Sequence, residues 1–157
     1  MPYLTNLENN LRLELNFIRN YLFEFDSKED YEKWIPFTLS VILPKRSIMI
    51  DEDARAAMSV YEIRNLVCGI ENILEKLTEQ ISSSFEFYSG ESFFGLKLEI
   101  IPEDIVVEVE LWINVGSQTQ GKIYGYDEGV RFATNERALR EFLIGIKQEL
   151  SCLEEIR

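Results

Sequence analysis

The chain has 157 residues, enough to bury a hydrophobic core, and we expect residues 1–157 to form a single domain. Hydrophobic residues make up 46% of the sequence and aromatic residues 12%, which excludes intrinsic disorder because this apolar surface offsets the ordering entropy. The net charge of −12 argues against nucleic acid and anionic membranes as partners, since the field of the protein repels both.

The N-terminus and the apolar runs predict the cellular compartment of the protein. The first ten residues, MPYLTNLENN, have neither a basic start nor an apolar run, so we expect no signal peptide. No apolar stretch is long enough to cross a bilayer. We therefore expect a soluble cytoplasmic protein. Cys68 and Cys152 fall among apolar residues in predicted helices, which predicts two buried free thiols and no disulfide.

Residues 4–25 fit two patterns. Alternating apolar residues over 11–17 predict a strand, whereas apolar residues at helical spacing and a Thr5–Glu8 capping box predict a helix. We favour the strand. The polar stretch 26–33 is expected to be a loop.

A strand and a short return strand are predicted next. Residues 37–43 alternate as a strand does, Pro44–Lys45 marks a turn, and Ile48 and Ile50 begin the return. The return strand runs into the acidic triplet Asp51–Asp53. The triplet lacks the spacing of an EF-hand loop, so we expect a solvated or partner-facing loop and no metal site.

Two amphipathic helices are predicted. Ser59 and Glu62 match a capping box, and the apolar face that follows predicts a helix over about 60–80. Thr134 or Asn135 caps a second helix. Its expected core residues are Leu139, Phe142, Leu143, Ile146, Leu150 and Leu153.

Four strands are expected between the helices, at 84–89, 93–100, 105–115 and 122–132. Residues 105–115, IVVEVELWINV, have an apolar residue at every odd position, which means one buried and one solvent-facing side. Five aromatic residues elsewhere in the chain are expected to anchor the core and not to form a ligand platform. They are Trp34, Phe85, Phe87, Phe93 and Phe94.

The turn Pro102–Glu103 predicts how the second and third of these strands pair. Pairing Ile100 with Ile105 keeps the two apolar faces together. The same register sets Lys97 opposite Glu108 on the solvent-facing side.

The turn GSQTQG (116–121) predicts the next pairing, with Val115 opposite Lys122. This register sets Glu110 opposite Asp127. Like charges opposed across a sheet are unfavourable, so either the register slips near Gly129 or the position is adapted to an external cation.

Helices that flank a run of antiparallel strands predict the fold class. We expect an α+β domain, with an antiparallel sheet of about six strands and two main amphipathic helices packed against it.

The sequence lacks the residues of most catalytic sites. With no histidine, Ser-His-Asp and Cys-His catalysis and histidine-ligated zinc are excluded, and no glycine-rich phosphate loop is present. We therefore expect no catalytic residues, no cofactor and no metal. A hydrolase with two convergent carboxylates stays open as an alternative, although no spacing singles out a pair.

The negative charge is concentrated in about a fifth of the chain. Between residues 99 and 128 the only base is Lys122, and the segment carries half of the net charge. Its acidic residues are Glu99, Glu103, Asp104, Glu108, Glu110, Asp127 and Glu128.

Trp112 lies on the side of its strand opposite the apolar positions. A helix covering this side would make Trp112 part of the core, but Glu108 and Glu110 argue against burial, because an unpaired buried carboxylate is costly. We expect an exposed tryptophan rimmed by acids, as at the centre of an interface. The predicted partner-binding residues are Glu103, Asp104, Glu108, Glu110, Trp112, Asn114, Asp127 and Glu128.

The order of these elements resembles a known family. The segments that carry it are DYEKWIPFTLSV, AAMSVYEIRNLVCGIENIL, FEFYSGESFFGLKLEI and RFATNERALREFLIGIKQEL, with Trp34, Met58–Ser59 and Glu62 as smaller marks. From about Leu11 onward the chain resembles the WapI-type immunity family. These are small bacterial proteins paired with the toxic C-terminal domains of wall-associated polymorphic toxins.

The resemblance implies that the protein neutralises a cognate toxin by direct binding and performs no chemistry. Many such toxins are nucleases with basic clefts, so an acidic partner fits, and charge complementarity speeds capture. One alternative is a non-enzymatic scaffold or regulatory protein that binds another basic protein. The other is the carboxylate hydrolase.

Overall fold

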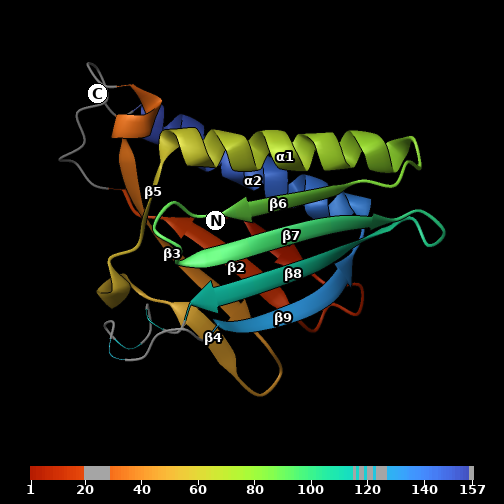
Figure 1. Cartoon of the computed structure of the whole chain (residues 1–157), viewed down its shortest axis with the longest axis horizontal. Coiled ribbons are helices and arrows are strands. Elements are labelled where there is room, and N and C mark those ends of the chain that lie inside the picture. Colours follow the sequence, from red (N-terminus) through yellow and green to blue (C-terminus); the bar gives the residue numbers. More distant parts are fainter. Residues whose placement is uncertain (20–28, 115, 117–118, 120–121, 123–126, 156–157) are drawn as a thin grey trace.

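The computed structural model describes residues 1–19, 29–114, 116, 119, 122 and 127–155, which form two antiparallel sheets and two α-helices (Figure 1). The α+β class is confirmed, but the strands are divided between two sheets instead of the predicted single one. The strands of the first sheet are β1 (Tyr3–Thr5), β2 (Arg12–Phe17), β3 (Trp34–Ile42), β4 (Ser47–Ile50) and β5 (Ala57–Ser59). Those of the second are β6 (Ser84–Tyr88), β7 (Phe94–Ile101), β8 (Val106–Asn114) and β9 (Asp127–Thr134).

The two sheets pack with their apolar sides together. Alternation buries Phe37 and Leu39 of β3 on one side of the core and Leu98 and Val109 of β7 and β8 on the other. Phe37 joins the sheets directly, because its ring meets the ring of Phe94 in an edge-on contact with centroids 5.6 Å apart. The expectation that the phenylalanines serve the core is confirmed: Phe87 and Phe94 are buried, and Phe85 and Phe93 are partly buried and pack against the core.

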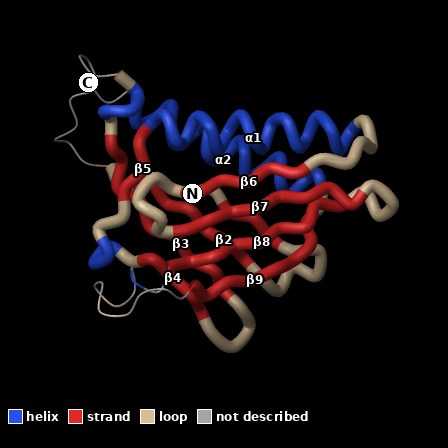
Figure 2. The backbone as a smooth tube through the Cα atoms, in the orientation of Figure 1, coloured by secondary structure: helices blue, strands red, loops and turns tan. Residues whose placement is uncertain are grey.

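The helices α1 (Val60–Thr78) and α2 (Glu136–Glu154) pack on each other along one margin of the sheets (Figure 2). α1 contacts β6 and β7, whereas α2 contacts β1, so the pair closes the core of both sheets. Every core residue predicted for the second helix is buried. Neither of these described helices has the length and apolar character needed to span a bilayer.

Both helices begin where their capping residues predict. Ser59 Oγ accepts a hydrogen bond from Glu62 N at 3.2 Å, and Glu62 Oε2 accepts one from Ser59 N at 2.8 Å, which completes the capping box. Glu62 Oε1 also accepts a hydrogen bond from Gly90 N and ties α1 to the loop after β6. Asn135 caps α2, with its Oδ1 2.9 Å from Ala138 N.

The N-terminal residues have the extended structure that we favoured. The predicted strand over 11–17 is confirmed as β2, and β1 adds a strand that the sequence did not suggest. Of the stretch 26–33, residues 29–33 contain a short 3₁₀ helix, η1 (Asp30–Glu32), and residues 26–28 lie outside the described residues.

The predicted β7–β8 register is wrong by two residues. Ile100 pairs with Val107 and not with Ile105, which lies in the turn with φ of 53°. The alternation predicted that the strand begins at Ile105. Because Ile105 has a left-handed backbone and belongs to the turn, β8 begins one residue later, at Val106. Because a shift of two residues keeps each side chain on its side of the sheet, the apolar faces are still matched.

The predicted β8–β9 register is also wrong. Glu110 pairs with Arg131, and Asp127 pairs with Asn114. β9 therefore begins at Asp127 and continues to Thr134, and the part of the prediction over 123–126 lies outside the described residues. The expected opposition of Glu110 and Asp127 therefore does not occur, and the observed β7–β8 register instead sets Glu99 opposite Glu108.

Two burial predictions are also corrected. Both cysteines are free as expected, but Cys68 is exposed and Cys152 is partly exposed, because each lies away from the buried stripe of its helix. Trp34 was expected to anchor the core, yet it is exposed, since the buried positions of β3 begin at Ile35.

The contact between the two sheets predicts the most sensitive position of the core. We expect Phe37→Ala to lower the free energy of unfolding by about 3–5 kcal/mol, because it removes a fully buried ring and leaves a cavity between the sheets. Urea denaturation measures this change. Tyr61→Ala, at an exposed aromatic in the first turn of α1, is the control and should cost less than about 1 kcal/mol. Equal losses for the two variants would contradict this account of the core.

Candidate binding face on the second sheet

The solvent side of the second sheet carries most of the predicted binding residues. We call it the outer face. Residues on this side alternate with the buried ones, and the observed registers align them across the four strands. They are Ser84, Glu86 and Tyr88 of β6, Gly95, Lys97 and Glu99 of β7, Glu108, Glu110, Trp112 and Asn114 of β8, and Asp127, Gly129, Arg131 and Ala133 of β9.

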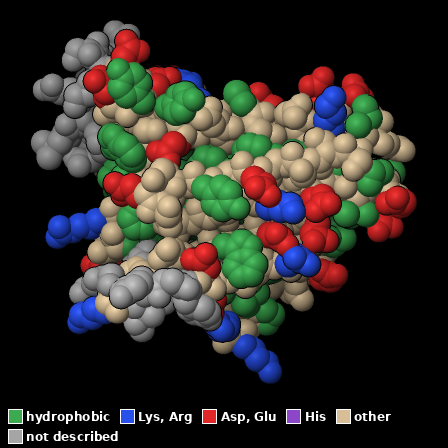
Figure 3. Space-filling model, viewed as in Figure 1, with side chains coloured by type: hydrophobic (Ala, Val, Ile, Leu, Met, Phe, Trp, Pro, Cys, Tyr) green, Lys and Arg blue, Asp and Glu red, His purple; other side chains and the backbone are tan. Residues whose placement is uncertain are grey.

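One row across the outer face alternates in charge. In strand order it reads Glu86, Lys97, Glu110 and Arg131. Arg131 forms an ion pair with Glu110 and lies 3.3 Å from the carboxylate of Glu108. The two central acids are thus partly neutralised by a base on the neighbouring strand. Figure 3 shows acidic and basic side chains intermixed on the visible surface.

The next row is aromatic. It contains Tyr88, Gly95, Trp112 and Gly129, one residue from each strand. The expected exposure of Trp112 is confirmed: the residue is 45% exposed, and Tyr88 is 68% exposed. Hydrophobic side chains accordingly gather at the middle of the face in Figure 3, beside the charged ones.

The other predicted residues lie at the two ends of β8. Asn114 pairs with Asp127 at one end, and its Oδ1 accepts a hydrogen bond from Gly116 N at 2.7 Å. Glu103 and Asp104 occupy the turn before the other end of β8. The nine residues of the strand, about 30 Å in length, separate them from Asn114 and Asp127. Glu128 is not on the outer face. It pairs with Ile113, which points inward, and forms an ion pair with Arg46 after β3.

Sequence reasoning missed Tyr88 and Arg131 as members of this face. It placed Lys97 on the solvent-facing side but opposite Glu108, whereas Lys97 pairs with Glu110. The alternation FEFY, with Phe85 and Phe87 inward, was the signal that Tyr88 points outward. Arg131 was missed because the predicted register placed Asp127, and not Arg131, opposite Glu110.

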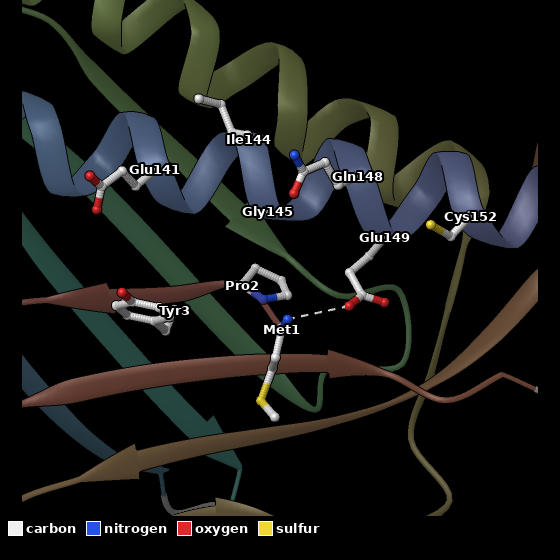
Figure 4. A pocket seen from close by; sticks show the side chains of 9 residues that line it. All are labelled: Met1, Pro2, Tyr3, Glu141, Ile144, Gly145, Gln148, Glu149 and Cys152. Atoms are coloured by element: carbon white, nitrogen blue, oxygen red, sulfur yellow. Dashed lines mark ion pairs between the residues drawn. The ribbon is translucent and has the colours of Figure 1, made fainter.

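A groove of about 560 Å³ lies beside the N-terminus and has two carboxylates in its lining (Figure 4). Met1, Pro2 and Tyr3 face α2 there, and the Met1 amine lies 3.4 Å from Glu149. Glu141, the other carboxylate of the groove, is eight residues away on the same helix, about 12 Å along its axis. These carboxylates do not converge as a glycoside-cleaving pair must.

The acidic loop Asp51–Asp53 is exposed and belongs to the first sheet. Asp51 Oδ1 accepts a hydrogen bond from Ala54 N at 3.3 Å, and so caps the 3₁₀ turn η2 (Glu52–Ala54). In the described part of the chain, no group of three His, Cys, Asp or Glu side chains is arranged to hold a metal ion.

Arg64 is held in a separate ionic cluster. Partial burial lowers the pKa of its guanidinium, but the hydrogen bond to Asp30 and the charges of Glu154 and Asp30 outweigh this, so the net shift is upward. Arg64 Nε lies 2.8 Å from Asp30, and the same side chain pairs with Glu154. A permanently charged Arg64 therefore links η1 to the end of α2, which is a structural role.

An exposed sheet face that carries aromatic and charged side chains is typical of proteins that act by binding other macromolecules. A sequence model of the immunity protein WapI-like family matches residues 4–153, nearly the whole chain, and the chain belongs to this family. The match confirms the resemblance and extends it to β1. No curated protein matches the sequence. Membership supports an immunity role, with a toxin as partner, in general terms.

The ion pair between Arg131 and Glu110 can be measured directly. We expect a double-mutant cycle of Arg131→Ala and Glu110→Ala to give a coupling energy of about 0.5–1 kcal/mol, because the pair is only partly desolvated. The coupling should fall in 1 M salt. The more exposed pair Arg137–Glu141 on α2 is the control and should couple less. A coupling that is absent, or unaffected by salt, would contradict the observed register.

Proposed function

We propose that this protein is an immunity protein that neutralises a cognate bacterial toxin domain by direct protein–protein binding through the outer face, without catalysing a reaction. Family membership supports the immunity role. The choice of surface rests on one observation: Trp112 is exposed beside Glu108 and Glu110, on a sheet whose other side is buried in the core. Exposed aromatics of this kind supply most of the binding energy in protein interfaces.

The charge of the outer face supports a basic partner. Its carboxylates, on Glu86, Glu99, Glu108, Glu110 and Asp127, outnumber its cations, on Lys97 and Arg131. Glu103 and Asp104 extend the negative charge beyond one end of β8. The net charge of −12 adds a field that accelerates the approach of a cationic surface.

A toxin of the nuclease class would present such a surface, because its cleft must attract phosphates. We propose that binding takes place in the cytoplasm, where the nucleic acid substrates of such a toxin lie. Glu128 contributes to the overall field but not to the contact itself, since Arg46 holds its carboxylate away from the outer face.

The proposal predicts protection and charge-dependent capture. Co-expression of this chain should protect cells from the toxin domain encoded directly upstream of its gene. We expect Glu108→Lys combined with Glu110→Lys to slow association with that purified domain about tenfold at low salt, because two steering charges are reversed. Stopped-flow or surface-based kinetics measure the rate, and the difference should shrink as salt rises.

The control reverses the same number of charges elsewhere. Glu136→Lys with Glu141→Lys alters two acids on α2 that are also paired with arginines. This variant should retain most of the association rate. Equal slowing by both double variants would remove the outer face as the contact, and failure of the unaltered chain to bind or protect would remove the proposed function. Binding to another basic protein without protection would favour a scaffold role.

A further inference from the structure

The aromatic row of the outer face has a geometry that surface charge does not explain. Tyr88 pairs with Gly95, Gly95 with Trp112, and Trp112 with Gly129, so that large rings and glycines alternate across the sheet. We infer that Tyr88 and Trp112 form one preformed aromatic platform that supplies most of the affinity for the toxin, and that the toxin meets it with an apolar patch rimmed by Lys or Arg. This inference rests on the proposed function.

Each ring occupies the space of the side chain that the neighbouring glycine lacks. A Cβ on Gly95 would lie 2.7 Å from Cε1 of Tyr88, and a Cβ on Gly129 would lie 2.5 Å from Cε3 of Trp112. The rings therefore lie down on the backbone of the next strand and do not stand upright in solvent. Both lean in the same direction, toward β9.

Such rings are fixed before the partner arrives. The backbone beneath each ring and the residues beside it restrict its rotation, so little side-chain entropy remains to be lost on binding. Their upper surfaces remain open, with Tyr88 more exposed than Trp112. A partner that covers them removes a large apolar area from water, which is the property of Trp and Tyr at the centres of interfaces.

A purely structural role accounts for part of this arrangement. A ring that covers a glycine of the neighbouring strand stabilises a sheet. A ring also covers a helix glycine in this chain, since Phe85 fills the space beside Gly69 of α1. That ring is partly buried between β6 and α1. On the outer face, the two covering rings are left exposed at alternate positions of one row, with Gly95 between them, and this exposure distinguishes a platform from a filler.

The surroundings of the platform define the chemistry of the partner. The row with Glu110 and Arg131 borders it on one side, and Asn114 with Asp127 borders it on the other. Carboxylates thus lie on both sides of the rings and fit a basic rim around an apolar patch. A second copy of this chain fits poorly, because it would bring two faces with excess negative charge together.

The test measures affinity and stability on the same variants. The probe is the purified toxin domain encoded directly upstream, titrated with the full-length chain by calorimetry. We expect Tyr88→Ala and Trp112→Ala each to weaken binding about 30-fold or more, as for interface hot spots. Tyr3→Ala is the matched control, because Tyr3 is 41% exposed on the first sheet with the Arg12 guanidinium 3.9 Å from its ring centre. It should leave the affinity unchanged.

A further variant keeps both rings and moves one. In Gly95→Ala the new Cβ would displace the Tyr88 ring, whereas its nearest backbone neighbour, the Phe87 oxygen, is 3.7 Å away. The protein should therefore fold, and its affinity should fall about tenfold although no aromatic group is lost. A filler role has no reason to produce this loss.

The outcomes separate the two proposals. If the unaltered chain fails to bind the probe, the proposed function fails. If it binds and the ring variants lose thermal stability but keep full affinity, the rings only cover the glycines and the platform is rejected. If the unaltered chain is a dimer by sedimentation and Trp112→Ala makes it monomeric, the platform is a self-association surface and the inference is overturned.

Discussion

The antiparallel register that joins β7, β8 and β9 decides which side chains share the outer face. Leu98, Val109 and Phe132 form a buried row across these strands, and shifting one strand by a single residue would turn its apolar side chains toward water. The cost of exposing such a row far exceeds any gain from surface ion pairs. Packing in the core therefore fixes the composition of the rows on the outside, including the row that contains Trp112.

The net charge of −12 does not by itself describe the charge of the outer face. Arg131 neutralises part of the charge of Glu108 and Glu110, so the centre of the outer face is a mixed ionic row and not a uniform acidic patch. Excess carboxylates remain at the ends of β8 and across the molecule as a whole. The field that attracts a cation is thus long-range, whereas the contact surface itself offers alternating charges that a partner must match in position.

The sequence predicted what depends on local periodicity and missed what depends on the path of the chain between elements. Alternation placed Trp112 outside and Val109 inside, and the capping residues located α1, because both signals lie within a few residues. The predicted registers were wrong because the alternation encodes neither the left-handed turn residue Ile105 nor which residue of β9 pairs with Glu110. For the same reason the pattern gave the faces of the strands but not their division between two sheets. The pairing of Glu110 with Arg131 followed from the register and was missed with it.

The two rows of the outer face serve different parts of a binding reaction, if the toxin contacts them as proposed. Charged residues such as Glu110 act over a distance and chiefly alter the rate of encounter, while buried aromatic contacts chiefly alter the rate of dissociation. An immunity protein needs both, since it must capture the toxin before damage occurs and must not release it. Adjacent rows of one sheet meet both needs, because the charged residues and the rings that lie over Gly95 and Gly129 occupy different rows.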